Sequence, residues 1–124
     1  MDVIFGKKIV IRNNRNVNNV TINDIDKSIN IVFPNVDIKQ LYLLVIYNMK
    51  GPYINYMMAN IPGCNIDRGK IVYDYIKPTL SEKYVISIYR QRYEVNIESY
   101  SRNKFPLKEF VKEGNLQLES IAFF

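Results

Sequence analysis

Short runs rich in Ile, Val and Tyr recur along the chain, separated by Pro, Gly, Asn or Asp. Runs of this length and composition are typical of β-strands, and the residues between them are typical of turns. They predict strands at 9–11, 29–33, 41–47, 56–59, 71–75 and 84–89. The run at 41–47 does not alternate with polar positions, so we expect a central strand that is covered on both faces. The pattern as a whole predicts a mostly β fold.

Helical spacing is strongest between 105 and 114. Leu107, Phe110 and Val111 follow the i, i+3, i+4 spacing of one helix face. Pro106 stands near the first helical position, and Gly114 marks the end of the pattern. We therefore expect a short amphipathic helix near the C-terminus. The residues that follow it, 116–124, end in an apolar stretch that we expect to dock in the core or in a sheet.

A weaker helical signal covers 20–28. Thr21 or Asn23 could cap a turn there. Ile22, Ile25 and Ile29 would share one face of it. Because β-branched side chains lose rotamer freedom in a helix, they lower its propensity, and the signal for this turn is weak.

Composition indicates one globular domain that spans 1–124. The chain has 124 residues, of which 48% are hydrophobic and 23% charged, and such a chain can bury a core without disulfides or a structural metal. Cys64 is the single cysteine, which excludes an intrachain disulfide and suits a reducing compartment. No signal-peptide pattern follows Met1, and the longest apolar run is well below the ~18 residues of a membrane span. We expect a cytoplasmic protein without a membrane span.

Residue usage is biased toward Ile, Asn and Tyr, whose codons are rich in A and T, and Trp is absent. This bias indicates a viral or otherwise AT-rich genome. A viral origin would place the protein in the host cytoplasm.

The chain contains no His, which restricts its chemistry. Ser-His-Asp and Cys-His catalysis, His-bearing zinc sites and haem with a proximal His are excluded.

Two carboxylate pairs are close in sequence, Asp24 with Asp26 and Asp67 with Asp74. They could act together or hold a cation, but they fit no known loop pattern and are expected to be solvated. Cys64 has no imidazole base and is expected to be a small structural residue. We predict a protein that is not an enzyme, without cofactor or metal.

Lys and Arg exceed Asp and Glu by 17 − 12, a formal net charge of +5. A basic surface favours acidic partners, including nucleic acid, anionic headgroups and acidic proteins. Exposed Arg beside Tyr is also the composition of a protein-binding hot spot. The candidate interaction surface predicted on this basis consists of Arg90, Arg92, Tyr93, Tyr100, Arg102 and Lys104. A solvated strand end and loop is the alternative interpretation.

Nucleic-acid binding is a separate hypothesis. Residues 89–93, Tyr-Arg-Gln-Arg-Tyr, interleave aromatic and basic side chains, as base stacking and phosphate contacts require. The same alternation arises at a strand end with one buried and one solvated face.

Several segments resemble family motifs in a collinear order. Residues 41–52 resemble a strand leading into Asp-Pro-Asp-x-Pro, 55–63 resemble His-Trp-x-x-x-Asn-Ile-Pro-Gly, and 82–91 resemble His-Arg-Tyr followed by an apolar strand and Gln. Residues 69–78 are similar to a segment that closes in Tyr-x-Gly-Pro, and 102–124 are similar to an ending of Arg-x-x-Phe, a helix and an apolar tail. With 4–6 and Phe33-Pro34, this series resembles the phosphatidylethanolamine-binding protein family, also called Raf kinase inhibitor-like proteins.

The resemblance implies a mostly β fold with a large central antiparallel sheet, a smaller sheet and short peripheral helices, one of them near the C-terminus. It also implies an anion pocket, which the family builds from an Asp, two His and a Tyr. The positions of this chain that match the pocket region, here called the family-pocket positions, are Asn48, Lys50, Pro52, Asn55, Glu82 and Tyr84.

The family's ionisable ligands are replaced at these positions. Glu82 stands in place of a His, and a carboxylate only accepts hydrogen bonds and repels an anion. Lys50 could restore positive charge, or it could pair with Glu82. Tyr84 is expected to be a core aromatic rather than a ligand donor.

The functional hypothesis is therefore a degenerate, non-enzymatic domain of this family that acts as a protein-binding or scaffolding module. The alternative is a basic binder of nucleic acid or of an anionic phosphate-bearing ligand. An unidentified protein is the expected partner, and the sequence does not indicate an oligomeric state.

Overall fold

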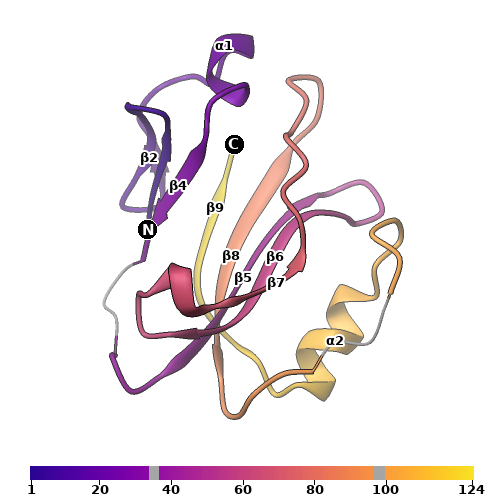
Figure 1. Cartoon of the computed structure of the whole chain (residues 1–124). Coiled ribbons are helices and arrows are strands. Elements are labelled where there is room, and N and C mark those ends of the chain that lie inside the picture. The colour runs from indigo at the N-terminus through magenta and orange to yellow at the C-terminus, as the bar shows by residue number, and fades with distance from the viewer. Residues whose placement is uncertain (34–36, 97–99) are drawn as a thin grey trace.

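The computed structural model describes residues 1–33, 37–96 and 100–124. Pro34, which contributed to the family resemblance, lies outside these ranges. Two antiparallel sheets form the fold (Figure 1). The small sheet has the order β3-β2-β1-β4, built from Asp2–Phe5 (β1), Lys8–Arg12 (β2), Arg15–Asn16 (β3) and Ile29–Val32 (β4). The large sheet has the order β7-β6-β5-β8-β9, built from Leu41–Asn48 (β5), Tyr53–Pro62 (β6), Lys70–Tyr73 (β7), Tyr84–Gln91 (β8) and Gln117–Phe123 (β9).

The helices are short. They are α1 (Ile22–Ile25), the 3-10 turn η1 (Ile66–Arg68) and α2 (Leu107–Glu113). The expected mostly β class is confirmed, with a larger and a smaller antiparallel sheet and a helix near the C-terminus.

Two apolar clusters lie on opposite faces of the large sheet. One fills the space between the sheets and includes Phe5, Ile11 and Ile31 of the small sheet. The other lies beneath α2 and includes Phe105 and Leu116. Figure 1 shows the small sheet and α2 on opposite sides of the large sheet. The chain is therefore layered as small sheet, large sheet and helix.

The strand β5 lies at the centre of the large sheet, as its unbroken apolar run predicts. Its alternate residues Leu44 and Ile46 enter the cluster between the sheets, while Leu43 and Val45 enter the cluster beneath α2. It pairs with β8 over its whole length. The expected burial of this run on both faces is confirmed.

The C-terminal elements also follow the sequence pattern. Helix α2 ends at Gly114, whose N–H donates to the Phe110 carbonyl. The ring of Phe110 packs edge-on against Phe105 at 5.5 Å between centroids. The residues after the helix form β9, which pairs with β8, so the expected docking of this segment in a sheet is confirmed.

The prediction for 20–28 is partly wrong. Thr21 caps a single turn, but Ile22 is 65% exposed and Ile29 belongs to β4, so these residues share no buried helix face. The carboxylate of Asp24 closes the turn instead by accepting the backbone N–H and the hydroxyl of Thr21. Asp24 is consequently buried, and the expectation that it is solvated is also wrong.

The observed bounds of other strands differ from the predicted ones, because strand pairing extends beyond some apolar runs and stops short of the end of others. The run at 56–59 is the middle of the longer strand β6, whereas the run at 71–75 ends its pairing at Tyr73. The Asn-rich segment after β2 makes a hairpin turn in which Asn13 and Asn14 have φ of 51° and 65°. Asn tolerates this left-handed conformation better than most residues, which accounts for the Asn cluster at this point.

Candidate functional site

The family-pocket positions meet at one end of the large sheet. Asn48 ends β5 and lies opposite both Tyr84 at the start of β8 and Tyr53 at the start of β6. Lys50 and Pro52 lie in the turn between β5 and β6, and Glu82 precedes β8. The structure therefore brings these residues, which are distant in sequence, to one place.

The amide side chains at this end are used in local hydrogen bonds. Asn48 Oδ1 accepts the backbone N–H of Lys50 at 2.9 Å. Asn55 is 2% exposed, and its Nδ2 donates to the Ile76 carbonyl at 2.9 Å while its own carbonyl accepts the Ile76 N–H at 2.8 Å. Asn55 Oδ1 is buried and has no hydrogen-bond partner among the described residues. Asn55 thus fastens the segment after β7 to β6.

Two charged residues at this end pair with each other, and a third, Lys83, lines the same hollow. Lys50 Nζ lies 3.7 Å from Glu82 Oε1, the arrangement that the sequence allowed as an alternative to anion binding. Because the Lys50 side chain is 83% exposed, the pair is screened by solvent and adds little stability. The pair matters for the local charge, because the Glu82 carboxylate cancels the positive charge of Lys50.

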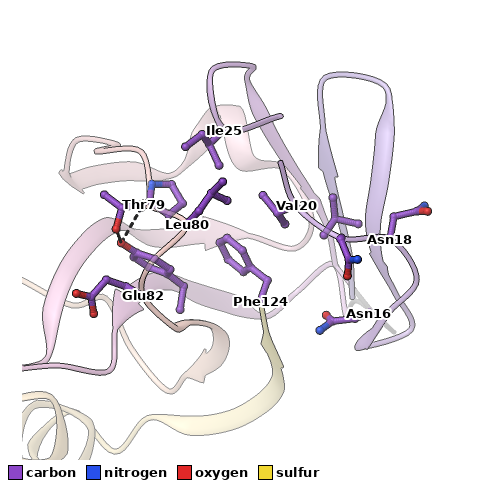
Figure 2. A pocket seen from close by; sticks show the side chains of 12 residues that line it. Asn16, Asn18, Val20, Ile25, Thr79, Leu80, Glu82 and Phe124 are labelled. Atoms are coloured by element: carbon purple, nitrogen blue, oxygen red, sulfur yellow. Dashed lines mark hydrogen bonds between the residues drawn. The ribbon is translucent and has the colours of Figure 1, made fainter. Parts of the chain in front are cut away.

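A cavity of about 290 Å³ lies next to this pair, between the sheets (Figure 2). Figure 2 shows Asn16 and Asn18 on one side, Thr79 and Glu82 on the other, and Phe124 between them. Among the side chains of the described residues that line it, one carries a formal charge, the Glu82 carboxylate. The cavity is lined by Val10, Asn16, Asn18, Asn19, Val20, Ile25, Pro78, Thr79, Leu80, Glu82, Tyr84 and Phe124.

Tyr84 is held as part of the core, in agreement with its expected role. Its ring stacks on Phe124 with centroids 5.7 Å apart, and its hydroxyl accepts the Thr79 N–H at 2.9 Å. Nearby Tyr75 has a buried hydroxyl without a hydrogen-bond partner among the described residues. Burial, reinforced by Tyr84, raises the pKa of Tyr75 to about 12. Tyr75 therefore stays protonated near neutral pH and cannot serve as a base.

The candidate interaction surface separates into two groups. Arg90 lies opposite Tyr42, near the start of β5, whereas the guanidinium of Arg102 contacts Ile54 at the other end of the β5–β6 hairpin. Because a strand rises ~3.4 Å per residue, the two ends of β5 are about 24 Å apart. The structure thus places Arg90 and Arg102 toward opposite ends of the large sheet.

Arg102 is occupied by internal contacts. Its Nη1 donates to the Ile54 carbonyl at 3.1 Å, and its Nη2 donates to the Asp74 carbonyl at 2.7 Å. Its Cζ lies 5.5 Å from the centroid of the Tyr73 ring, within the range of a cation–π contact. Lys104 is exposed beside it. Arg102 therefore ties three chain segments together rather than offering a free charge.

The two tyrosines of the predicted surface differ in their contacts. Tyr100 packs edge-on against Phe105 at 5.7 Å between centroids, and its carbonyl accepts the Tyr73 hydroxyl at 2.6 Å. Tyr93 is 52% exposed, and its hydroxyl accepts Asn115 Nδ2 at 3.4 Å. Both line one shallow cavity between α2 and the loop after β8.

Arg90 and Arg92 form a different site with a lysine that sequence analysis missed. They line a hollow of about 470 Å³ together with Lys39, here called the cationic cleft. Lys39 lies two residues before β5, and because Leu41 pairs with Gln91, the antiparallel pairing brings the residues before β5 to the end of β8 that carries Arg92. The remaining lining residues are Gln40, Leu41, Gln91, Asn115 and Gln117.

Other candidate chemistry receives no support from the structure. Cys64, which was expected to be a small structural residue, is exposed. Asp26 pairs with Lys77, and Asp67 and Asp74 are exposed, in line with the expectation for these three carboxylates. Within the described ranges, no group of three or more Cys, Asp or Glu is placed to hold a metal ion. None of the described helices has the length and apolar character needed to cross a membrane.

No family model matches this sequence, and no curated protein matches it either.

Proposed function

We propose that this protein is a non-enzymatic, phosphatidylethanolamine-binding-like domain that acts as a protein-binding or scaffolding module. The collinear motif series and the large and small antiparallel sheets support the fold part of this proposal. The absence of His removes the side chain that most often serves as a general base. We therefore assign the module a binding role.

The ion pair between Lys50 and Glu82 carries the proposal. At the place where the family binds an anion, this chain presents a balanced pair of charges and amides that already hold backbone groups. A phosphate entering the adjacent cavity would meet the Glu82 carboxylate and would find no cation among the described lining residues. The inherited ligand is therefore disfavoured, and the outer surface carries the interaction.

Calorimetric titration tests the loss of the pocket. Phosphate and phosphorylethanolamine should give no saturable heat with the unmodified protein, and tight saturable binding at this end would contradict the proposal. The variant Asn48→Asp, Asn55→His, Glu82→His restores the family's ionisable groups and should bind phosphate weakly, because the cavity beside Tyr84 is present. Glu109→His, on the exposed side of α2, is the matched control and should gain no binding.

Cross-linked capture from the native cell tests the protein-binding role. A partner retained after nuclease treatment supports a protein–protein contact, whereas material lost with the nucleic acid contradicts it. We expect Arg90→Glu with Arg92→Glu to abolish this capture while the domain stays folded. Lys70→Glu with Lys108→Glu changes the same charge at exposed positions of β7 and α2 and should leave capture intact.

A basic binder of nucleic acid or another phosphate-bearing ligand is the second candidate function. The cationic cleft favours it, because three positive side chains from two separate segments converge there. The cleft lies at the end of the large sheet opposite the family-pocket positions.

A further inference from the structure

The cationic cleft is built on a fixed backbone. Arg90 lies in β8 and Arg92 directly follows its last residue, Gln91, so both arginines are carried by the end of this strand. Gln91 is 2% exposed; its Oε1 accepts the Asn60 N–H at 2.9 Å and its Nε2 donates to Asn60 Oδ1 at 2.7 Å. Gln40 Nε2 donates to the Gln91 carbonyl and so fastens the residues before β5 to the end of β8. The cations are therefore preorganised.

The arginines of the cleft differ from Arg102 in their contacts. Arg90 Nε is buried and has no hydrogen-bond partner among the described residues, and the nearest carboxylate oxygen, Glu119 Oε2, lies 3.7 Å away. This distance is too long for a hydrogen bond. Arg92 is exposed at the rim. With Lys39 included, the lining carries three cations and no carboxylate, and the Glu119 side chain balances one of them from outside the lining.

An aromatic side chain stands at the margin of the cleft. Asn115 lines the cleft and its Nδ2 donates to the hydroxyl of Tyr93 at 3.4 Å, so the tip of this half-exposed ring, which also lines the shallow cavity beside α2, reaches the margin of the cleft. Tyr89 contributes no ring, because it is buried beneath the sheet face that α2 covers. Cations that track a phosphate backbone beside an exposed aromatic ring are the arrangement that binds single strands without sequence preference.

We propose that the cationic cleft binds single-stranded nucleic acid, with Lys39, Arg90 and Arg92 contacting successive phosphates and Tyr93 stacking on a base. The strand must be single, because a base becomes available for stacking only when it is unpaired. This inference rests on the second candidate function and assigns nucleic-acid binding to the cationic cleft. The protein-binding role is tested separately by capture after nuclease treatment.

Fluorescence anisotropy with a labelled oligothymidylate of about ten nucleotides tests the cleft, since stacking platforms of this kind hold roughly 4–16 nucleotides. Binding should be saturable at low ionic strength. Three phosphate contacts predict a slope of log K against log salt of about −2, from roughly −0.7 per contact on single strands. Arg90→Gln with Arg92→Gln leaves one cation, so affinity should fall at least about tenfold and the slope should approach about −0.7.

Matched variants separate cleft binding from general attraction to a basic protein. Lys70→Gln with Lys108→Gln removes the same charge outside the cleft and should leave affinity and slope nearly unchanged. Tyr93→Ala should weaken binding at least about fivefold, whereas Tyr93→Phe keeps the ring and should retain it. Circular dichroism of each variant checks that the domain stays folded.

Three outcomes would overturn the inference. One is the absence of oligonucleotide binding by the folded protein at low salt. Another is an equal loss in the cleft and control variants, which would indicate charge attraction alone. The last is displacement of the strand by inorganic phosphate or a phosphoserine peptide at comparable concentration, which would identify a single phosphate group as the ligand. In each case the calorimetric result at the family-pocket positions stands independently, because these lie at the other end of β5.

Discussion

Lys8 Nζ lies 2.9 Å from Asp24 Oδ2, which joins strand β2 to the turn α1. Only 5% of the Asp24 side chain is exposed, and the same oxygen accepts two hydrogen bonds from Thr21. One carboxylate thus caps a turn and anchors it to the small sheet.

The contacts of Asp24 predict an acid-labile turn. The hydrogen bond from Lys8, followed by that from the Thr21 backbone, lowers the pKa of Asp24 from 3.8 to about 2. Because the folded pKa lies below the unfolded value, this stabilisation is present above pH ~4 and is lost as pH falls toward 2. Asp24→Asn should be less stable than the unmodified protein at neutral pH, and the difference should shrink on acidification. Urea unfolding across this pH range measures it, and a constant difference would contradict the role of the charge.

The two phenylalanines beneath α2 should differ in their energetic contribution. Phe105 is 1% exposed, so Phe105→Ala should cost about 3–5 kcal/mol. Phe110 is half-buried, and Phe110→Ala should cost less, about 1–3 kcal/mol. Urea midpoints with unchanged m-values would measure both. A Phe110→Ala cost near zero would mean that the helix is loosely attached.

Arg102 should behave as a structural residue. Arg102→Ala removes hydrogen bonds to the carbonyls of Ile54 and Asp74 and should cost about 1–2 kcal/mol. Arg102→Lys should restore little of it, because an ammonium cannot reproduce the planar fork of the guanidinium. Thermal unfolding provides the measurement, and Arg92→Ala, at an exposed position, is the control that should change stability by less than about 0.5 kcal/mol.

The hydroxyl of Tyr75, which has no hydrogen-bond partner in the part of the chain that the structure describes, predicts a stabilising substitution. Removing a buried donor that has no partner relieves a desolvation cost, so Tyr75→Phe should leave stability unchanged or raise it by roughly 1 kcal/mol. It should also remove one phenol that titrates at about pH 12, visible by ultraviolet difference spectroscopy. A clear loss of stability would indicate that the hydroxyl has a partner in solution.

The sequence was most informative where apolar runs are long and local. The unbroken apolar runs of β5 and β8 predicted that both strands are buried. The spacing of Leu107, Phe110 and Val111 predicted α2. Turn α1 was misread because its stability comes from Asp24 and from Lys8 in another strand, which apolar periodicity does not record.

The charged sites depended on long-range pairing that no local pattern contains. Arg92 and Arg102 are close in sequence, but the register of β5 with β8 and the contacts of Arg102 place them at different ends of the sheet. The same register brings the residues before β5 to the end of β8, where Lys39 and Arg92 line one hollow although they are distant in sequence. A sequence shows which side chains are charged, whereas only the strand order shows which of them meet.

The separation of the two ends of β5 makes them energetically independent. Residues farther apart than about 10 Å that share no partners usually have additive effects. A four-residue variant can combine changes at Asn48 and Glu82 with changes at Arg90 and Arg92. Its change in the free energy of unfolding should equal the sum of the changes measured for the two double variants. Changes at the family-pocket end should therefore leave binding at the cationic cleft unaltered, so either end of the sheet can be varied without disturbing the other.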